Sequence, residues 1–447
     1  MGGRSTSTHT GGSMGHPGNT VSHGGNPSGA RGSIGTHGAM SAHSPGRTVS
    51  LRGGGSASIR PNGQIRSINR NGMQIHNNLH GGRTIVSEHN GVRVVGNGRG
   101  NGYVQRAYVT RGGHSYYSRT YYSHGAYHVG VYRGYYYHGF NYYGYHPGFY
   151  FHPGFYGWAY RPWGFGLAWG VGFGGWGWAG SPWYGYYGPY FAPYPVYPSA
   201  AFWLTDYLIS QNLQAAYAAR AEANADADAG APDSYDNAPA DNGPAPTSGT
   251  VTLTPEVKEA IAEEVKAELA EQQQQAGSQG GDAQAQPQPA NAPNGDVPPA
   301  LDPARRAFVV DNTITVVSDG QECSLTGGDV ITRLTDTPDA DNKVTASVSA
   351  SKKNECGAGK TITVSVDDLQ EMRNHFEEQL DNGMKTLAEK QGTGNMPKAP
   401  DTGTTASDIP APQPDNTAAK ELTDQDAAAN QTEAQVKQEA TAQSNSQ

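Results

Sequence analysis

The two halves of this chain carry opposite charge, and this asymmetry constrains its fold more than any other feature. Residues 1–199 contain 15 Arg, no Lys and a single acidic residue, Glu88, so their formal charge is +14. The whole chain carries −9, so residues 200–447 carry −23. Segments of opposite charge attract each other, and a basic segment also attracts external polyanions. The sequence leaves both interpretations of the arginines open.

Much of the chain lacks the apolar residues that a packed core needs. The 447 residues include 61 Gly and 29 Pro, and only 35% are hydrophobic. Gly-rich and polar tracts cannot offset a backbone entropy of roughly 1 to 2 kcal/mol per residue. We therefore predict a largely disordered, multi-segment chain. The predicted disordered segments and linkers are residues 1–66, 223–252, 273–304 and 391–447.

The basic half has a pattern typical of antiparallel strands. Tyr and β-branched residues alternate with polar ones, and turn signals recur at Asn90-Gly91, Gly112-Gly113 and His124-Gly125. These features predict an aromatic antiparallel β-meander over residues 67–148. Residues 149–222 are rich in Gly, Trp, Tyr and Pro, and we expect this segment to end in a helix that begins at Ala200.

The acidic half contains two segments with regular patterns. Thr254 and Pro255 predict the start of an isolated amphipathic helix over residues 253–272, whose narrow apolar stripe indicates docking or self-association. Residues 305–390 predict a small all-β barrel followed by a helix, which Asp367 would cap. The apolar stripe of that last helix is a candidate partner-docking surface. Its residues are Leu369, Met372, Phe376 and Leu380.

The two cysteines, Cys323 and Cys356, both lie in the predicted barrel. Two cysteines of an exported protein usually pair, whereas cytosolic cysteines stay reduced, so we expect a disulfide. The sequence shows no signal peptide after Met1, and we expect that the true start lies upstream. The predicted location is the periplasm, the outer envelope or the secreted space.

The arginines of the basic half are the candidate polyanion contacts, because guanidinium groups pair with phosphate or carboxylate while aromatic rings stack on bases or sugars. A stronger expectation is that these arginines bind tyrosines or the acidic half of the chain itself. The candidates are Arg106, Arg111, Arg119, Arg133 and Arg161.

No metal, cofactor or catalytic site is predicted. His124 and His128 have the spacing of a helical zinc pair, but their context is strand-like. The Gly170–Gly175 run matches a dinucleotide-binding pattern without the strand and helix that this pattern needs. The sequence has no motif for a nucleophile or a zinc protease, so we expect neither an enzyme nor a small-molecule substrate.

The order of segments resembles a group of uncharacterised, Tyr/Gly-rich, predicted exported proteins of soil bacteria. The text that carries this resemblance includes Arg119-Thr120-Tyr121-Tyr122, Pro182-Trp183-Tyr184 and Trp203-Leu204-Thr205-Asp206-Tyr207. The segment from Gly327-Gly328-Asp329-Val330 to Asp368-Leu369 is also similar to bacterial Src-homology-type small β-barrels. The resemblance implies an envelope location and no activity.

These features together favour a non-catalytic structural or interaction protein of the bacterial envelope. Its aromatic half would adhere to surface polymer, to a membrane interface or to itself, and its small barrel would dock a protein partner. The alternative is an Arg/Tyr-driven protein that binds a polyanion, either nucleic acid or acidic polysaccharide, with a steep salt dependence.

Overall fold

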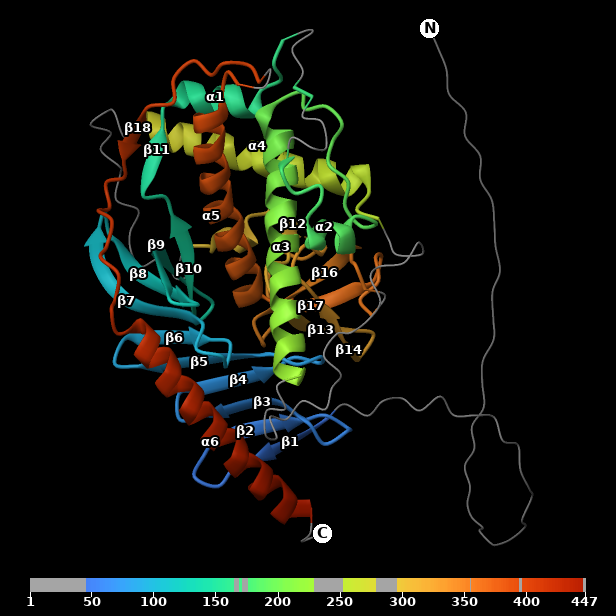
Figure 1. Ribbon diagram of the computed structural model, residues 1–447. Helices are drawn as coiled ribbons and strands as arrows, with labels where there is room; N and C mark the ends of the chain where they lie inside the picture. The colour runs from blue at the N-terminus through green and yellow to red at the C-terminus, as the bar shows by residue number, and fades with distance from the viewer. Residues whose placement is uncertain are drawn as a thin grey trace, which may run out of the picture. The chain divides into compact units, whose positions relative to one another are not determined.

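The computed structural model describes residues 46–164, 169–170, 176–228, 252–278, 296–353, 355–393 and 396–444. All of them belong to one compact unit, His43–Gln447. The described residues of this unit form a ten-stranded sheet, a six-stranded sheet, a two-stranded sheet and six α-helices, and helix α5 (Val366–Lys390) packs against both larger sheets (Figure 1).

The ten-stranded sheet is an antiparallel meander in which each strand pairs with its neighbours in the sequence. This confirms the predicted meander. Hairpin turns such as Asn90-Gly91 and His124-Gly125 have positive φ at both residues, which matches the right-handed twist of the flanking strands. The strands are β1 (Arg47–Ser50), β2 (Ser56–Ile59), β3 (Ile65–Arg70), β4 (Met73–Asn77), β5 (Arg83–His89), β6 (Val92–Gly96), β7 (Gly102–Arg111), β8 (His114–Ser123), β9 (Ala126–Tyr137) and β10 (Phe140–His146).

The sheet begins at Arg47, about twenty residues before the predicted start, so residues 47–66 are not the disordered coil that their Gly and Ser content suggests. Few apolar residues are needed here, because only one face of β1 to β5 is buried. Ala57, Ile59, Ile68, Ile75 and Ile85 point to that face. The other face remains polar, as in many antiparallel sheets.

The C-terminal tail supplies the cover for that apolar face, although the sequence predicted disorder from residue 391 onward. Helix α6 (Ala418–Ser444) lies across the sheet (Figure 1), and its Leu422, Ala429 and Val436 are fully buried against the strands. The strand β18 (Thr404–Ala406) pairs with β11 (Phe149–Phe151). Polar helices of this kind gain most of their stability from tertiary packing, which local composition does not reveal.

Within the described residues, the acidic β-rich domain is a six-stranded antiparallel sheet whose two edge strands are β12 (Ala307–Val309) and β14 (Gln321–Leu325). The pairings therefore do not show the closed barrel that the sequence predicted. Its order is β12 (Ala307–Val309), β15 (Val330–Arg333), β16 (Lys343–Ala350), β17 (Thr361–Ser365), β13 (Ile314–Ser318) and β14 (Gln321–Leu325). A short 3-10 helix, η2 (Pro299–Leu301), precedes it.

A disulfide between Cys323 and Cys356 lies in the core of this domain, as the sequence predicted. Their Cα atoms are 5.4 Å apart, and 33 positions separate them in the sequence. The following helix, α5, begins two residues earlier than expected. Ser365, not Asp367, is its N-cap, because the Ser365 hydroxyl accepts a hydrogen bond from the Asp368 amide.

The Trp-rich segment packs with four helices into the largest core of the molecule. These helices are α1 (Pro153–Tyr160), α2 (Pro182–Tyr187), α3 (Ala200–Asp228) and α4 (Pro255–Ser278). The predicted docking stripe of α4 contributes Ile261, Val265 and Leu269 to this core, each almost fully buried. The stripe therefore packs against the chain itself. Of the Gly170–Gly175 run, residues 171–175 lie outside the described residues.

Candidate functional site

Four of the five arginines that the sequence singled out pair with carboxylates of the acidic half. Arg106 pairs with Asp415 and Glu421, and Arg111 pairs with Asp408 at 3.1 Å. Arg133 pairs with Asp296, and Arg161 lies over the ring of Tyr160 at 5.4 Å. The structure thus places these basic side chains against the chain's own acidic and aromatic groups.

Arg119 occupies the most enclosed of these positions, with no exposed surface. Its guanidinium binds both carboxylate oxygens of Glu371, at 2.7 and 2.9 Å, and its Nε donates to Gln105 at 2.6 Å. The rings of Tyr103 and Tyr132 lie on it, with centroids 4.3 and 3.9 Å away. This fork geometry and the two aromatic faces satisfy a charge that would otherwise be costly to bury.

The polar face of α5 extends this site along the sheet. Tyr121 and Tyr132 share a hydrogen bond of 2.8 Å, and Tyr132 also donates to Glu378. One turn further on, Asp381 accepts from Tyr145 at 3.0 Å. The sequence reasoning missed these α5 carboxylates, because acids on a helix are most often solvated. The only sequence feature that pointed to these carboxylates was the acidic charge of the C-terminal half, which is opposite to that of the arginine- and tyrosine-rich half.

Burial changes the protonation of these carboxyls. Desolvation raises the pKa of Glu378 to about 7 and that of Asp381 to about 7. Burial acts in the same direction on Glu371, but the Arg119 guanidinium outweighs it and leaves the pKa of Glu371 below its ordinary value. The face of α5 therefore holds one ionised carboxylate beside carboxyls that keep a proton near neutral pH.

The opposite side of α5 carries the candidate docking residues. Leu369, Met372 and Leu380 are at most 1% exposed, and Phe376 is 8% exposed. Leu369 and Met372 belong to the core of the acidic domain, whereas Phe376 and Leu380 belong to the Trp-rich core. All four side chains are thus covered by the chain itself.

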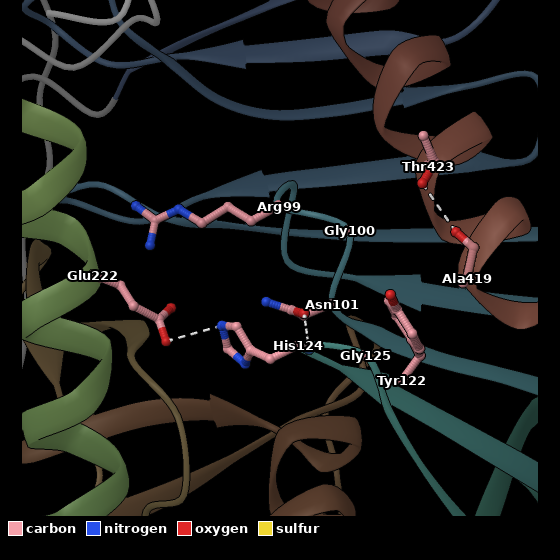
Figure 2. Close-up of a pocket in the computed structure, with 9 residues that line it drawn as sticks. All are labelled: Arg99, Gly100, Asn101, Tyr122, His124, Gly125, Glu222, Ala419 and Thr423. Atoms are coloured by element: carbon pink, nitrogen blue, oxygen red, sulfur yellow. Dashed lines mark hydrogen bonds and ion pairs between the residues drawn. The ribbon is translucent and has the colours of Figure 1, made fainter. Parts of the chain in front are cut away.

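An open cavity of about 530 Å³ lies where hairpin loops of the large sheet meet two helices (Figure 2). Arg99 and Asn101 line it from the β6–β7 loop, Tyr122 and His124 from the β8–β9 hairpin, and Glu222 from α3. His124 Nε2 lies 3.2 Å from a Glu222 oxygen, and the His124 amide donates to Asn101 Oδ1 at 3.1 Å. The walls thus combine an aromatic ring, an amide and charges of both signs.

The described residues contain no group of three or more His, Cys, Asp and Glu side chains that could hold a metal ion. His124 and His128 lie on different parts of a β-hairpin, at its tip and in β9. No α-helix in the described ranges is both long enough and apolar enough to cross a membrane. Comparison of the chain with protein-family models, with curated proteins and with solved structures found no match.

Proposed function

We propose that this protein is a non-catalytic structural and interaction protein of the bacterial periplasm, outer envelope or secreted space, whose aromatic half attaches to a surface polysaccharide. The observation that carries this proposal is the open cavity of Figure 2 beside exposed tyrosine. Tyr127 is 42% exposed, and its ring lies 5.1 Å from that of Tyr122 in the cavity wall.

The chemistry of the cavity suits a hydroxyl-rich polymer. A sugar ring has an apolar face that can lie on an aromatic ring, and its hydroxyls both donate and accept hydrogen bonds. Glu222 offers acceptor oxygens and the Asn101 amide offers donors, so both needs of a hydroxyl are met. Arg99 and Glu222 carry opposite charges in the same wall, so the cavity offers a polyanion no excess of positive charge.

The disulfide supports the location. A cysteine pair in a protein core persists in oxidising compartments, whereas the cytosol keeps such thiols reduced. Fractionation of cells that produce the native protein, followed by thiol labelling under denaturing conditions, tests this point. We expect Cys323 and Cys356 to be unlabelled and the protein to lie outside the cytoplasm. A cytosolic protein with two labelled thiols would overturn the proposed location.

Co-sedimentation with insoluble polymers tests the attachment. We expect the purified protein to pellet with at least one of isolated peptidoglycan, cellulose and chitin, and the variant Tyr127→Ala to lose most of this binding. Tyr136→Ala is the matched control, because Tyr136 is 61% exposed but lies near the other end of β9. Equal loss in both variants, or no binding to any of the three, would refute the cavity as the attachment site.

The polyanion alternative has a different signature in the same assay. Binding to DNA or heparin that falls steeply with salt and depends on Arg106 or Arg111 would favour it, since counterion release dominates such binding. The carboxylates that now pair with these arginines would then have to be displaced. We expect polymer binding through the cavity to change little with salt.

A further inference from the structure

Two lysine–aspartate pairs are buried in the molecule. Lys258 of α4 lies with its Nζ 2.6 Å from Asp206 Oδ1 of α3, and their side chains are 6% and 0% exposed. Lys352 lies 2.8 Å from Asp329, at 3% and 0% exposure. Lys and Asp are seldom buried so completely, and desolvation offsets much of the attraction in such pairs.

The two pairs differ in how their lysine is held. Lys352 Nζ donates to Gly327 O, Asp329 Oδ1 and Thr326 O, at 2.7, 2.8 and 3.3 Å. Three acceptors match the three hydrogens of an ammonium group and hold this amine in place, although burial lowers the pKa of Lys352 as well. Lys258 Nζ donates to the carbonyl of Ala192 at 2.8 Å and otherwise faces Asp206.

Aromatic rings surround the Lys258 amine. Its Nζ lies 3.7 Å from the ring centroid of Tyr194 and 5.3 Å from that of Phe191. Burial lowers the pKa of Lys258 and raises the pKa of Asp206, in spite of their mutual attraction. Both changes lower the cost of transferring a proton from the ammonium group to the carboxylate.

The carboxyl of Asp206 is also polarised on its far side. Its Oδ2 accepts hydrogen bonds from the Tyr194 amide at 2.6 Å and from the Tyr197 hydroxyl at 2.9 Å. Trp176 Nε1 in turn donates to the Tyr197 oxygen at 3.0 Å. Two donors on one oxygen of a carbonyl group are the arrangement that stabilises a tetrahedral intermediate of acyl transfer.

We infer that Lys258 and Asp206 join in an intramolecular amide bond between α3 and α4. The lone pair of the neutral Nζ attacks Cγ of the protonated Asp206 carboxyl, and the negative charge that forms on Oδ2 is held by Tyr194 and Tyr197. A proton passes from Nζ to Oδ1, which leaves as water when the carbonyl re-forms. One carbon–nitrogen bond forms, one carbon–oxygen bond breaks, and no oxidant or cofactor is needed.

This cross-link is independent of the proposed polymer binding. It ties the Trp-rich core together across residues 207–257, as the disulfide ties the acidic domain across the segment between Cys323 and Cys356. Closing a long segment restricts the unfolded chain and so stabilises the folded one. A covalent bond of this kind also withstands reduction, which a disulfide does not.

Mass spectrometry of the full-length, folded, disulfide-reduced protein tests the inference. We expect an intact mass lower than that of the sequence by one water molecule. Trypsin should fail to cleave after Lys258, and peptide mapping should recover one branched peptide that contains both Lys258 and Asp206. The Lys258→Arg and Asp206→Ala proteins should each show the full mass of their own sequence, without the loss of water, and a lower melting temperature.

The Lys352–Asp329 pair is the internal comparison. Asp329 Oδ2 also accepts two hydrogen bonds, from the Thr326 amide at 2.7 Å and the Thr326 hydroxyl at 3.3 Å, but Lys352 Nζ is held by three acceptors, so we expect its peptides to remain unjoined. A folded wild-type protein with the unmodified sequence mass, cleaved normally after Lys258, would overturn the inference without requiring any variant to fold. Loss of water mapped to another residue pair would overturn it equally. Polymer co-sedimentation by a Lys258→Arg protein that retains its fold would show that the two proposals are separate.

Discussion

Two regions of the large sheet pack on helices through different kinds of side chain, aliphatic in one and charged or polar in the other. The first five strands bury small aliphatic side chains such as Ile75 and Ile85 beneath α6. The strands β7 to β9 instead bury Arg119, Gln105 and a group of tyrosines against the carboxylates of α5. We call these the aliphatic sector and the charged sector. The aliphatic sector tolerates imprecise packing, whereas each polar atom of the charged sector needs a correctly placed partner.

The largest effect is expected from removing one partner in the charged sector. Glu371→Ala would leave the fully buried Arg119 guanidinium without its carboxylate. Removing the partner of a buried charge typically costs about 3 to 5 kcal/mol, and we expect a loss near the lower value because the Glu371 side chain itself is 36% exposed. Chemical denaturation of both proteins, monitored by far-UV circular dichroism, would measure the loss of unfolding free energy.

A double variant separates the pair from the charge that it leaves behind. Arg119→Met with Glu371→Leu removes both charges, and we expect it to recover most of the stability lost in Glu371→Ala. A double variant as unstable as the single one would mean that the aromatic cage around Arg119, and not the ion pair, carries the energy. The charged sector would then be stabilised mainly by side-chain packing, as the aliphatic sector is.

A smaller loss is expected in the aliphatic sector. Ile85 is fully buried under α6, and Ile85→Ala removes apolar contact and leaves a cavity at a cost of about 3 kcal/mol. Ile85→Val should cost only about 1 kcal/mol, because most of the volume remains. Denaturation midpoints of the two variants test this graded response, and equal losses would contradict it.

The sequence predicted the strands better than it predicted what covers them. Alternation and turn residues such as Asn90-Gly91 are local signals, so the meander and the strands of the acidic domain could be found from them. The role of α6 could not, because its Leu422, Ala429 and Val436 are sparse in a polar tail and meet their partners more than three hundred positions away. The pairing of Arg119 with Glu371 is equally non-local, and only the opposite charge of the two halves pointed to it.

The carboxyls of the charged sector should make its stability depend on pH. Burial raises the pKa of Asp381 from 3.8 to about 7, so the folded protein holds a proton that the unfolded chain has lost at pH 6. Stability is therefore greatest below the unfolded pKa and falls as pH rises through the folded value. Between about pH 5 and about pH 8 this one group accounts for about 2 to 3 kcal/mol.

Asp381→Asn tests that assignment, since an amide keeps the shape of the protonated carboxyl without titrating. The slope of unfolding free energy against pH should become shallower in this variant, while Glu378, with a similarly raised pKa, keeps part of it. Asp424→Asn is a suitable control, because this carboxylate lies on the exposed face of α6 beside Lys420. An unchanged slope in Asp381→Asn would assign the pH response to other carboxyls.

The smallest effect is expected where charge pairs reach solvent. Arg106 binds Asp415 and Glu421 at the start of α6, but its side chain is 36% exposed. Exposed pairs contribute about 0 to 1 kcal/mol and weaken further in salt. Arg106→Ala should therefore lower stability by less than about 1 kcal/mol in dilute buffer and by less still at high salt, in contrast to Glu371→Ala. If Arg106→Ala instead lost as much unfolding free energy as Glu371→Ala, and the loss persisted at high salt, the packing of α6 on the sheet would depend on the ion pairs of Arg106 as well as on aliphatic contacts.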